Sequence, residues 1–147
     1  QVALSLSDAF CVERHRASFQ ELVDGHVDIL FANEMEITSL YKANSFEEAA
    51  EAVRGRCTIA ALTRSELGSL ILNGSGTHTI PAFQLGELVD TTGAGDLYAA
   101  GFLHAHCQGQ PVEACGRLGS LCAGQVVTQL GPRPQADLKA LVAQHLG

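Results

Sequence analysis

The sequence predicts an α/β fold in which a parallel sheet carries helices on both faces. Short apolar segments that read as strands alternate with segments of helical spacing, which is the order typical of a parallel α/β sheet. Residues 27–32 are apolar at odd and even positions alike except at Asp28, as expected for a strand that is covered on both sides. Hydrophobic residues make up 46% of the 147 residues and charged residues 17%, so the composition predicts one packed domain.

The first part of the chain is predicted to form two buried strands and two helices. Residues 2–6 read as a short buried strand, and Ser7 is the expected N-cap of a helix that continues to Gly25. Residues 27–32 form the second strand, and a short helix is expected to follow Asn33.

The middle of the chain is predicted to form a helix and a third strand. Ser45 and Glu48 have the spacing of a capping box, which predicts a helix that closes at Gly55. Residues 57–63 then read as a strand, which completes the alternation of three strands and the helices between them.

The rest of the chain is predicted to be a hairpin followed by helices. Residues 69–74 and 76–82 read as the two arms of a β-hairpin, with Gly74 and Gly76 at the turn. Three helical segments follow at 94–108, 111–130 and 136–146. Pro111 suits the first turn of the second of these helices, and Gly131 with Pro132 is expected to end it.

A glycine-rich turn at the start of the first of these helices is the candidate for chemistry. A helix leaves about four backbone N–H groups unpaired at its N-terminus and carries roughly half a positive charge there. Gly93, Ala94 and Gly95 can therefore hold a phosphoryl group on backbone N–H groups, with Asp96 beside it as a base. A simple turn with a capping acid fits the spacing equally well. No Lys-Ser or Lys-Thr pair follows, so the turn is not a Walker A loop.

The longer segment around this turn, DTTGAGDLYAAGF, resembles the C-terminal signature of the PfkB carbohydrate kinases, the ribokinase-like superfamily. The resemblance implies that the backbone of Gly93, Ala94 and Gly95 is the anion hole for the γ-phosphate of ATP. It also implies that Asp96 is the general base that deprotonates a hydroxyl of a sugar or nucleoside. The family fold is a parallel α/β sheet with helices on both faces, in agreement with the order of the predicted elements.

Two other segments extend the resemblance. The tetrapeptide NEME is similar to the Asn-x-x-Glu motif of the family, which implies that Asn33 and Glu36 organise Mg²⁺, partly through water. The segment TRSELG resembles the Thr-x-Gly-x-x-Gly segment near the nucleotide, but Ser65 stands where glycine is usual. Thr63 and Gly68 are therefore the implied ATP contacts in this segment.

The family also implies contacts near the adenine and a site for a monovalent cation such as K⁺. The adenine would lie beside a helix rich in small residues, at Ala123, Gly124 and Val127. Close helix packing explains these small residues better than ligand contact does. The cation would be held by Asp90, Thr92 and a carbonyl near Gly131, although Asp90 can equally well be a cap of the turn.

The resemblance covers the C-terminal half of the family, so residues 1–147 are expected to be the ATP-binding half of a longer kinase domain. The chain begins with Gln1 and its only methionine is Met35, as expected for a piece of a longer protein. Within the family, the sequence is most similar to adenosine-kinase-like bacterial sugar kinases. Without the N-terminal half, which carries the substrate face and lid, the chain is expected to be inactive and to self-associate through an open sheet edge. The full-length enzyme is expected to be a homodimer.

Composition and charge exclude several other classes of protein. The net charge of -7 argues against binding to nucleic acid or to an anionic membrane, and no apolar run is long enough to span a bilayer. The five scattered cysteines read as small buried residues of a cytoplasmic protein. A hydroxymethylpyrimidine-type vitamin kinase and a non-catalytic nucleotide-binding module remain alternatives. Binding alone does not require Asp96, which favours an enzyme.

Overall fold

The computed structural model describes residues 1–147 and divides into two compact units. The first unit comprises residues 1–65 and 70–79, and the second comprises residues 66–69 and 80–147. None of the helices is long and apolar enough to cross a lipid bilayer.

The first unit is built on a five-stranded sheet in the order β1-β2-β3-β4-β5. The strands are β1 (Ala3–Ser5), β2 (Ile29–Asn33), β3 (Ile59–Thr63), β4 (Ser69–Asn73) and β5 (Gly76–Ile80), of which only the end residues Ser69 and Ile80 belong to the second unit. The pairs β1–β2 and β2–β3 are parallel, as predicted. A two-residue turn joins β4 to β5, a connection that only antiparallel neighbours can use, so the sheet is mixed.

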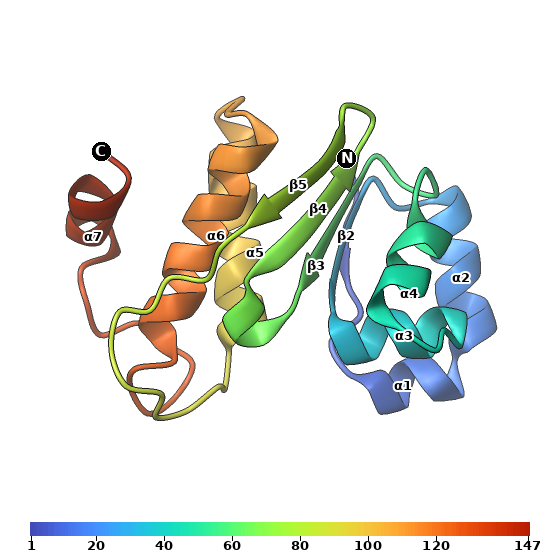
Figure 1. The fold of residues 1–147 in the computed structure, drawn as a ribbon, viewed down its shortest axis with the longest axis horizontal. Coiled ribbons are helices and arrows are strands. Elements are labelled where there is room, and N and C mark those ends of the chain that lie inside the picture. Colours follow the sequence, from blue (N-terminus) through green and yellow to red (C-terminus); the bar gives the residue numbers. More distant parts are fainter. The chain divides into compact units, whose positions relative to one another are not determined.

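Four helices cover one face of this sheet (Figure 1). They are α1 (Ala9–Arg14), α2 (Arg16–Gly25), α3 (Glu34–Tyr41) and α4 (Phe46–Val53). The helix α4 shows why they pack there, because its buried residues Phe46, Ala49, Ala50 and Val53 recur at helical spacing and form one apolar stripe. Leu30 of β2 belongs to the same core cluster.

The prediction that the second strand is buried on both faces is confirmed. Leu30 and Ala32 are buried, and so are Ile29 and Phe31, whose side chains alternate with them along the strand. Asp28, the polar exception just before the strand, accepts a hydrogen bond from the backbone N–H of Val2 at 2.6 Å.

The first strand and helix differ from the prediction in three respects. The strand β1 is not buried, because it lies at the edge of the sheet, and Ala3 and Ser5 are exposed. Ser7 is not the N-cap. Asp8 is, since its carboxylate accepts a hydrogen bond from the N–H of Cys11 at 2.9 Å. The predicted single helix is broken at His15, which has φ −120° and separates α1 from α2.

The predicted capping box of α4 is only half formed. The Ser45 hydroxyl accepts a hydrogen bond from the N–H of Glu48 at 3.1 Å, as expected for an N-cap. The Glu48 carboxylate bonds the N–H of Asn44 instead of that of Ser45. The helix nevertheless begins and ends within two residues of the predicted limits.

The second unit consists mainly of α5 (Ala94–Cys107), α6 (Val112–Val126) and α7 (Leu138–His145). The helices α5 and α6 lie side by side (Figure 1) and approach each other at two glycines. A Cβ on Gly101 would lie 2.8 Å from the Leu118 carbonyl oxygen, and one on Gly119 would lie 2.7 Å from that of Tyr98. Larger residues at these two positions would push the helices apart.

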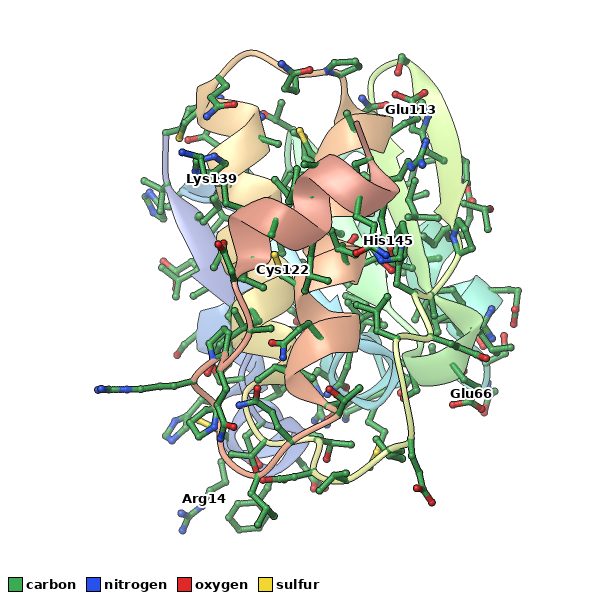
Figure 2. All side chains as sticks on the ribbon, turned by 90° about the vertical axis from the view of Figure 1, so that its left-hand side faces the viewer. Arg14, Glu66, Glu113, Cys122, Lys139 and His145 are labelled. Carbon is green, nitrogen blue, oxygen red and sulfur yellow. The ribbon has the colours of Figure 1, made fainter.

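The limits of α6 and α7 follow from local hydrogen bonds. The helix α6 ends four residues before the predicted limit of 130, because the N–H and the hydroxyl of Thr128 both bond the Gln125 carbonyl and tighten the last turn. Asp137 caps α7 through the N–H groups of Lys139 and Ala140. His145, shown at the other end of α7 in Figure 2, makes an edge-on ring contact with Phe83 at 6.2 Å between centroids.

The cysteines were predicted to be buried, and this is wrong for two of them. Cys115 and Cys122 are buried on α6, and Cys57 is partly buried. Cys11, on α1, and Cys107, the last residue of α5, are exposed.

Candidate functional site

The predicted site residues fall into two groups, one in each unit. The first unit holds Asn33, Glu36 and Thr63. The second unit holds Gly68, Asp90, Thr92, Gly93, Ala94, Gly95, Asp96, Ala123, Gly124, Val127 and Gly131.

Asn33 and Glu36 form a complete capping box at the start of α3. The Asn33 side chain accepts a hydrogen bond from the N–H of Glu36 at 2.8 Å. The Glu36 carboxylate in turn accepts bonds from the backbone N–H of Asn33 at 2.8 Å and from its side-chain amide at 2.9 Å. Glu36 is only 6% exposed, and this burial raises the pKa of its carboxyl, against the opposing effect of the Asn33 N–H bond.

This donor set suits an ion that keeps most of its water. Mg²⁺ in kinases is usually held by one or two carboxylates together with phosphate oxygens and water molecules. One carboxylate and one amide, each with free lone pairs beyond their mutual bonds, can supply such a partial set. No group of three or more His, Cys, Asp or Glu side chains gathers anywhere in the chain, so a metal cage made of protein ligands alone is absent.

Glutamine at position 36 separates the structural role of this carboxylate from its chemical role. The raised pKa means that the stability contributed by protonating Glu36 is present below its ordinary pKa of 4.5 and is lost as the pH rises through the raised value. Glu36→Gln removes that titration, but it also replaces one of the two oxygens that accept bonds from Asn33, which costs stability at every pH. The stability of the variant relative to wild type should therefore improve as the pH rises from acidic to neutral. The resemblance implies that Glu36 acts on a hydrated Mg²⁺, and on that hypothesis phosphoryl transfer should fall by about 10- to 100-fold, because a neutral amide attracts a hydrated cation less. Urea unfolding at acidic and at neutral pH measures the stability, and a kinase assay measures phosphoryl transfer. If activity fell only in proportion to the fraction of folded protein, Glu36 would have a role in folding alone.

Thr63 lies next to Asn33 at the carboxyl ends of neighbouring parallel strands, because the two residues are register partners in β2 and β3. The next residue, Arg64, was not predicted as part of the site. Its guanidinium group lies 4.0 Å from the centre of the Phe46 ring and bonds the carboxylates of Glu34 at 3.3 Å and Glu47 at 3.7 Å. Arg64 thereby ties the first turns of α3 and α4 to the end of β3. The sequence did contain a signal for this role, because Glu34 and Glu47 both lie in the first turn of a predicted helix and can pair with an arginine.

Ser65 adopts the backbone conformation that explains why glycine is usual at this position. Its φ is 51°, in the left-handed region, which costs a residue with a side chain about 1–2 kcal/mol. Three residues on, Gly68 has φ 86°, and a Cβ there would collide with the Ile80 carbonyl oxygen. Glycine at 68 is therefore required by its close approach to the backbone of residues 80–82.

Ser65→Gly is expected to stabilise the protein slightly. Relief of the left-handed conformation is partly offset by the backbone freedom that glycine regains on unfolding, so the net gain should be under about 1 kcal/mol. Chemical unfolding measures it. Ser75→Gly is the matched control, since Ser75 lies in a turn without a positive φ, and an equal gain there would refute the explanation.

In the second unit, Gly93 is the N-cap of α5, and its φ of 81° turns the chain into the helix. The N–H of Ala94 donates to the Thr91 carbonyl at 3.1 Å. The N–H groups of Gly95 and Asp96 belong to the first helical turn, where no intrahelical acceptor exists. The Asp96 side chain is exposed on the same turn. We call residues 93–96 the anion turn.

The two glycines of the anion turn have different surroundings. A Cβ on Gly93 would lie 2.6 Å from the Cβ of Pro132, and its φ is strained for any other residue. A Cβ on Gly95 would meet nothing within 4 Å. Gly93 is therefore required by the fold, whereas the space in front of Gly95 is open.

Asp90 fastens the segment before the anion turn. One carboxylate oxygen accepts bonds from the N–H and the hydroxyl of Thr92, at 2.9 and 2.7 Å, and the other accepts from the N–H of Gly131 at 2.9 Å. The Thr92 hydroxyl is the main cause that lowers the pKa of Asp90, with the two N–H groups adding to it. The three residues predicted to hold a monovalent cation are thus joined by direct hydrogen bonds.

The three positions predicted to flank adenine have structural contacts. A Cβ on Gly124 would collide with the Phe83 carbonyl oxygen, so close packing requires this glycine. The Val127 carbonyl accepts the N–H groups of Val89 at 2.8 Å and Asp90 at 3.2 Å. Ala123 is partly buried on the same helix. Packing therefore accounts for Gly124 and Val127 without a ligand.

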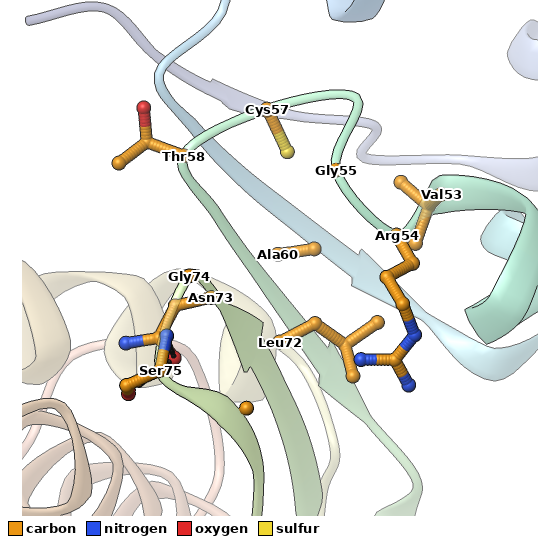
Figure 3. Close-up of a pocket in the computed structure, with 11 residues that line it drawn as sticks. Val53, Arg54, Gly55, Cys57, Thr58, Ala60, Leu72, Asn73, Gly74 and Ser75 are labelled. Atoms are coloured by element: carbon orange, nitrogen blue, oxygen red, sulfur yellow. Dashed lines mark hydrogen bonds between the residues drawn. The ribbon is translucent and has the colours of Figure 1, made fainter.

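A cavity of about 550 Å³ in the first unit lies away from these residues. Figure 3 shows Cys57, Ala60 and Leu72 directed toward the same space, with Arg54 at its side. The cavity is lined by the segment before β3 and by the β4–β5 turn, whereas Asn33 and Thr63 lie at the opposite ends of their strands.

Comparisons with known proteins find similar sequences and folds among kinases. Residues 2–138 match the profile of the pfkB family carbohydrate kinases. A cytidine kinase of Thermococcus kodakarensis is 36% identical over 121 residues, which cover 80% of this chain and 43% of that enzyme. The crystal structure of a probable sugar kinase from Rhizobium etli superimposes with a TM-score of 0.93 at 48% identity, over 97% of this chain and 43% of the other. Adenosine kinase from Sinorhizobium meliloti superimposes with a TM-score of 0.92 at 47% identity, over 97% of this chain and 44% of the other. The chain thus spans less than half the length of these relatives.

Proposed function

Because the chain belongs to the PfkB family of carbohydrate kinases, we propose that it is the ATP-binding part of an enzyme that phosphorylates a hydroxyl of a sugar or nucleoside. The observation that carries the proposal is the anion turn. Its first helical turn has N–H groups without intrahelical acceptors, open space in front of Gly95 and an exposed carboxylate on Asp96. N–H groups without intrahelical acceptors occur at every helix start, so the open space in front of Gly95 and the exposed Asp96 carboxylate are the features that favour a phosphoryl site.

In the proposed reaction Asp96 is the general base. The Asp96 carboxylate takes the proton of the acceptor hydroxyl, and the hydroxyl oxygen forms a bond to the γ-phosphorus of ATP. The bond between that phosphorus and the bridging oxygen breaks, and ADP leaves with the bond electrons. The N–H groups of the anion turn stabilise the charge on the transferred phosphoryl group, which is the main task of a protein in this chemistry.

ATP and Mg²⁺ are the proposed cofactors. Mg²⁺ supplies charge neutralisation at the phosphates when it is bound. Glu36 and Asn33 act on the hydrated ion, and Thr63 and Gly68 contact the nucleotide. Ala123, Gly124 and Val127 form the helix beside the adenine. Asp90, Thr92 and Gly131 hold the loop that a monovalent cation such as K⁺ is proposed to bind.

The class of acceptor follows from the named relatives. They include kinases for cytidine and adenosine and a probable sugar kinase, so the acceptor is proposed to be a nucleoside or a sugar. The face that selects it is proposed to lie in the part of the enzyme that this chain does not span. Residues 1–147 alone are therefore expected to be inactive. The complete enzyme is proposed to be a cytoplasmic homodimer.

The test is a substrate panel with the longest natural chain that contains this sequence. The enzyme is incubated with MgATP and adenosine, cytidine, ribose, fructose or hydroxymethylpyrimidine, and products are read by mass spectrometry. A phosphorylated nucleoside or sugar supports the proposal and names the acceptor. A product only with hydroxymethylpyrimidine favours a vitamin kinase, and ATP binding without any product favours a nucleotide-binding module.

A further inference from the structure

We propose that Gln129 is a positioning residue, which holds the anion turn in place through the loop at residues 131–135. The proposal rests on the proposed function, because it assigns a task in phosphoryl transfer to a side chain that does not belong to the anion turn. All of the contacts that carry it lie within the second unit.

Gln129 closes the loop onto the end of α6 with three hydrogen bonds. Its side-chain carbonyl accepts bonds from the side-chain amide of Gln125 at 3.0 Å and from the N–H of Gln135 at 2.9 Å. Its own amide donates to the Arg133 carbonyl at 2.5 Å. The middle of the segment from 131 to 135 and its far end are thereby attached to one side chain.

Gln125 makes this attachment rigid. The residue is only 6% exposed, and its side-chain oxygen is buried without a hydrogen-bond partner. Its amide group donates to Gln129, so the buried glutamine is oriented by that one bond. A leucine or isoleucine would fill the same space without an unsatisfied acceptor, so packing alone does not explain a glutamine here.

The loop in turn touches the anion turn at Gly93 and is linked to the segment directly before it at Asp90. The N–H of Gly131 bonds Asp90 at 2.9 Å, and Asp90 is bonded to Thr92 directly before the turn. Pro132 lies against Gly93 so closely that a Cβ on Gly93 would be 2.6 Å from the proline Cβ. A movement of the loop therefore reaches the anion turn both through a hydrogen bond and through a packing contact.

The expected consequence is a loss of kcat with little change in KM. The N–H groups of the anion turn act on charge that develops during transfer, so a small displacement affects the transition state more than the binding of ATP. Gln129→Met, which removes all three bonds at similar volume, should lower kcat by about 10- to 100-fold, as misplacement of about 1 Å does elsewhere. Gln129→Glu keeps an acceptor for Gln125 and Gln135, but its second carboxylate oxygen faces the Arg133 carbonyl oxygen and repels it. It should therefore recover only the part of the loss that depends on the two accepted bonds.

The experiment uses the full natural enzyme, with Gln108→Met as the matched control. Like Gln129, Gln108 is hydrogen-bonded to a side chain four residues earlier, that of His104, at 3.0 Å. It lies at the opposite end of α5 from the anion turn. Steady-state kinetics give kcat and KM for each variant. The double variant with Pro132→Ala tests the route, because effects that act through one loop should not add.

Hydrogen exchange of the amides at residues 90–96 provides a measurement that does not depend on activity. Gln129→Met should speed exchange there, and Gln108→Met should not. Unchanged exchange, or an unchanged kcat in an active enzyme, would overturn the inference, and so would fully additive effects with Pro132→Ala. A wild-type enzyme that phosphorylates nothing would instead contradict the proposed function, and the exchange data would still decide whether Gln129 holds the turn.

Discussion

Replacing Asp96 by asparagine is expected to lower kcat by about 10²–10⁴-fold, the usual contribution of a positioned general base. Asparagine has the same size but cannot take a proton from the acceptor hydroxyl. Asp96 is exposed in the first turn of α5, so the loss of its charge should reduce stability by no more than about 1 kcal/mol. The affinity for MgATP should change little. Kinetics, ATP titration and thermal unfolding of the full-length variant separate these effects.

Asp137→Asn is the matched control for this prediction. Asp137 is also an aspartate at the start of a helix of the second unit, where it caps α7. Its replacement should affect stability and leave kcat unchanged. If Asp96→Asn turned over as fast as the wild type, Asp96 would be only a favourable charge at a helix start.

Replacing Gly93 by alanine is expected to destabilise the protein by at least about 2 kcal/mol. The positive φ of 81° disfavours any side chain, and the new methyl group would press on Pro132. Gly95→Ala should behave in the opposite way. Its methyl group meets nothing within 4 Å, and alanine in a helix is more stable than glycine by roughly 0.5–1 kcal/mol.

Activity completes the contrast between the two glycines. The Gly95→Ala enzyme should be at least as stable as the wild type and should still transfer phosphate more slowly, because the methyl group enters the open space in front of the turn. Unfolding curves and kcat are measured for both variants. A fully active Gly95→Ala enzyme would show that the phosphoryl group does not approach this backbone.

The sequence was sufficient for those parts of the fold that depend on local pattern. The apolar stripe of α4 and the two-sided burial of β2 follow directly from residue spacing. The burial of β1 was predicted incorrectly because an apolar strand at a sheet edge has the same pattern as a central strand. The break at His15 is a local change of backbone angle, and the early end of α6 depends on the two hydrogen bonds of Thr128. Periodicity reveals neither.

In the candidate site, too, the local motifs could be predicted from the sequence and the contacts between distant segments could not. The motifs pointed to the anion turn and to Asn33 and Glu36, and the resemblance to PfkB kinases is confirmed. The contacts that hold the turn could not be predicted. Asp90 and Gly131 are 41 residues apart in the sequence, and the contact of Pro132 with Gly93 also joins two distant segments. Residues of this kind become visible only when the fold brings the two segments together.

The central claim, that this chain carries the machinery for phosphoryl transfer to a hydroxyl, is tested most directly by following the γ-phosphate. The full-length wild type and the Asp96→Asn variant are incubated with Mg²⁺, the accepted nucleoside or sugar, and ATP labelled at the γ-phosphorus. We predict that the label moves to the acceptor in the wild type and remains in ATP in the variant. Label that reaches only water, or that reaches the acceptor equally fast in both enzymes, would contradict the account.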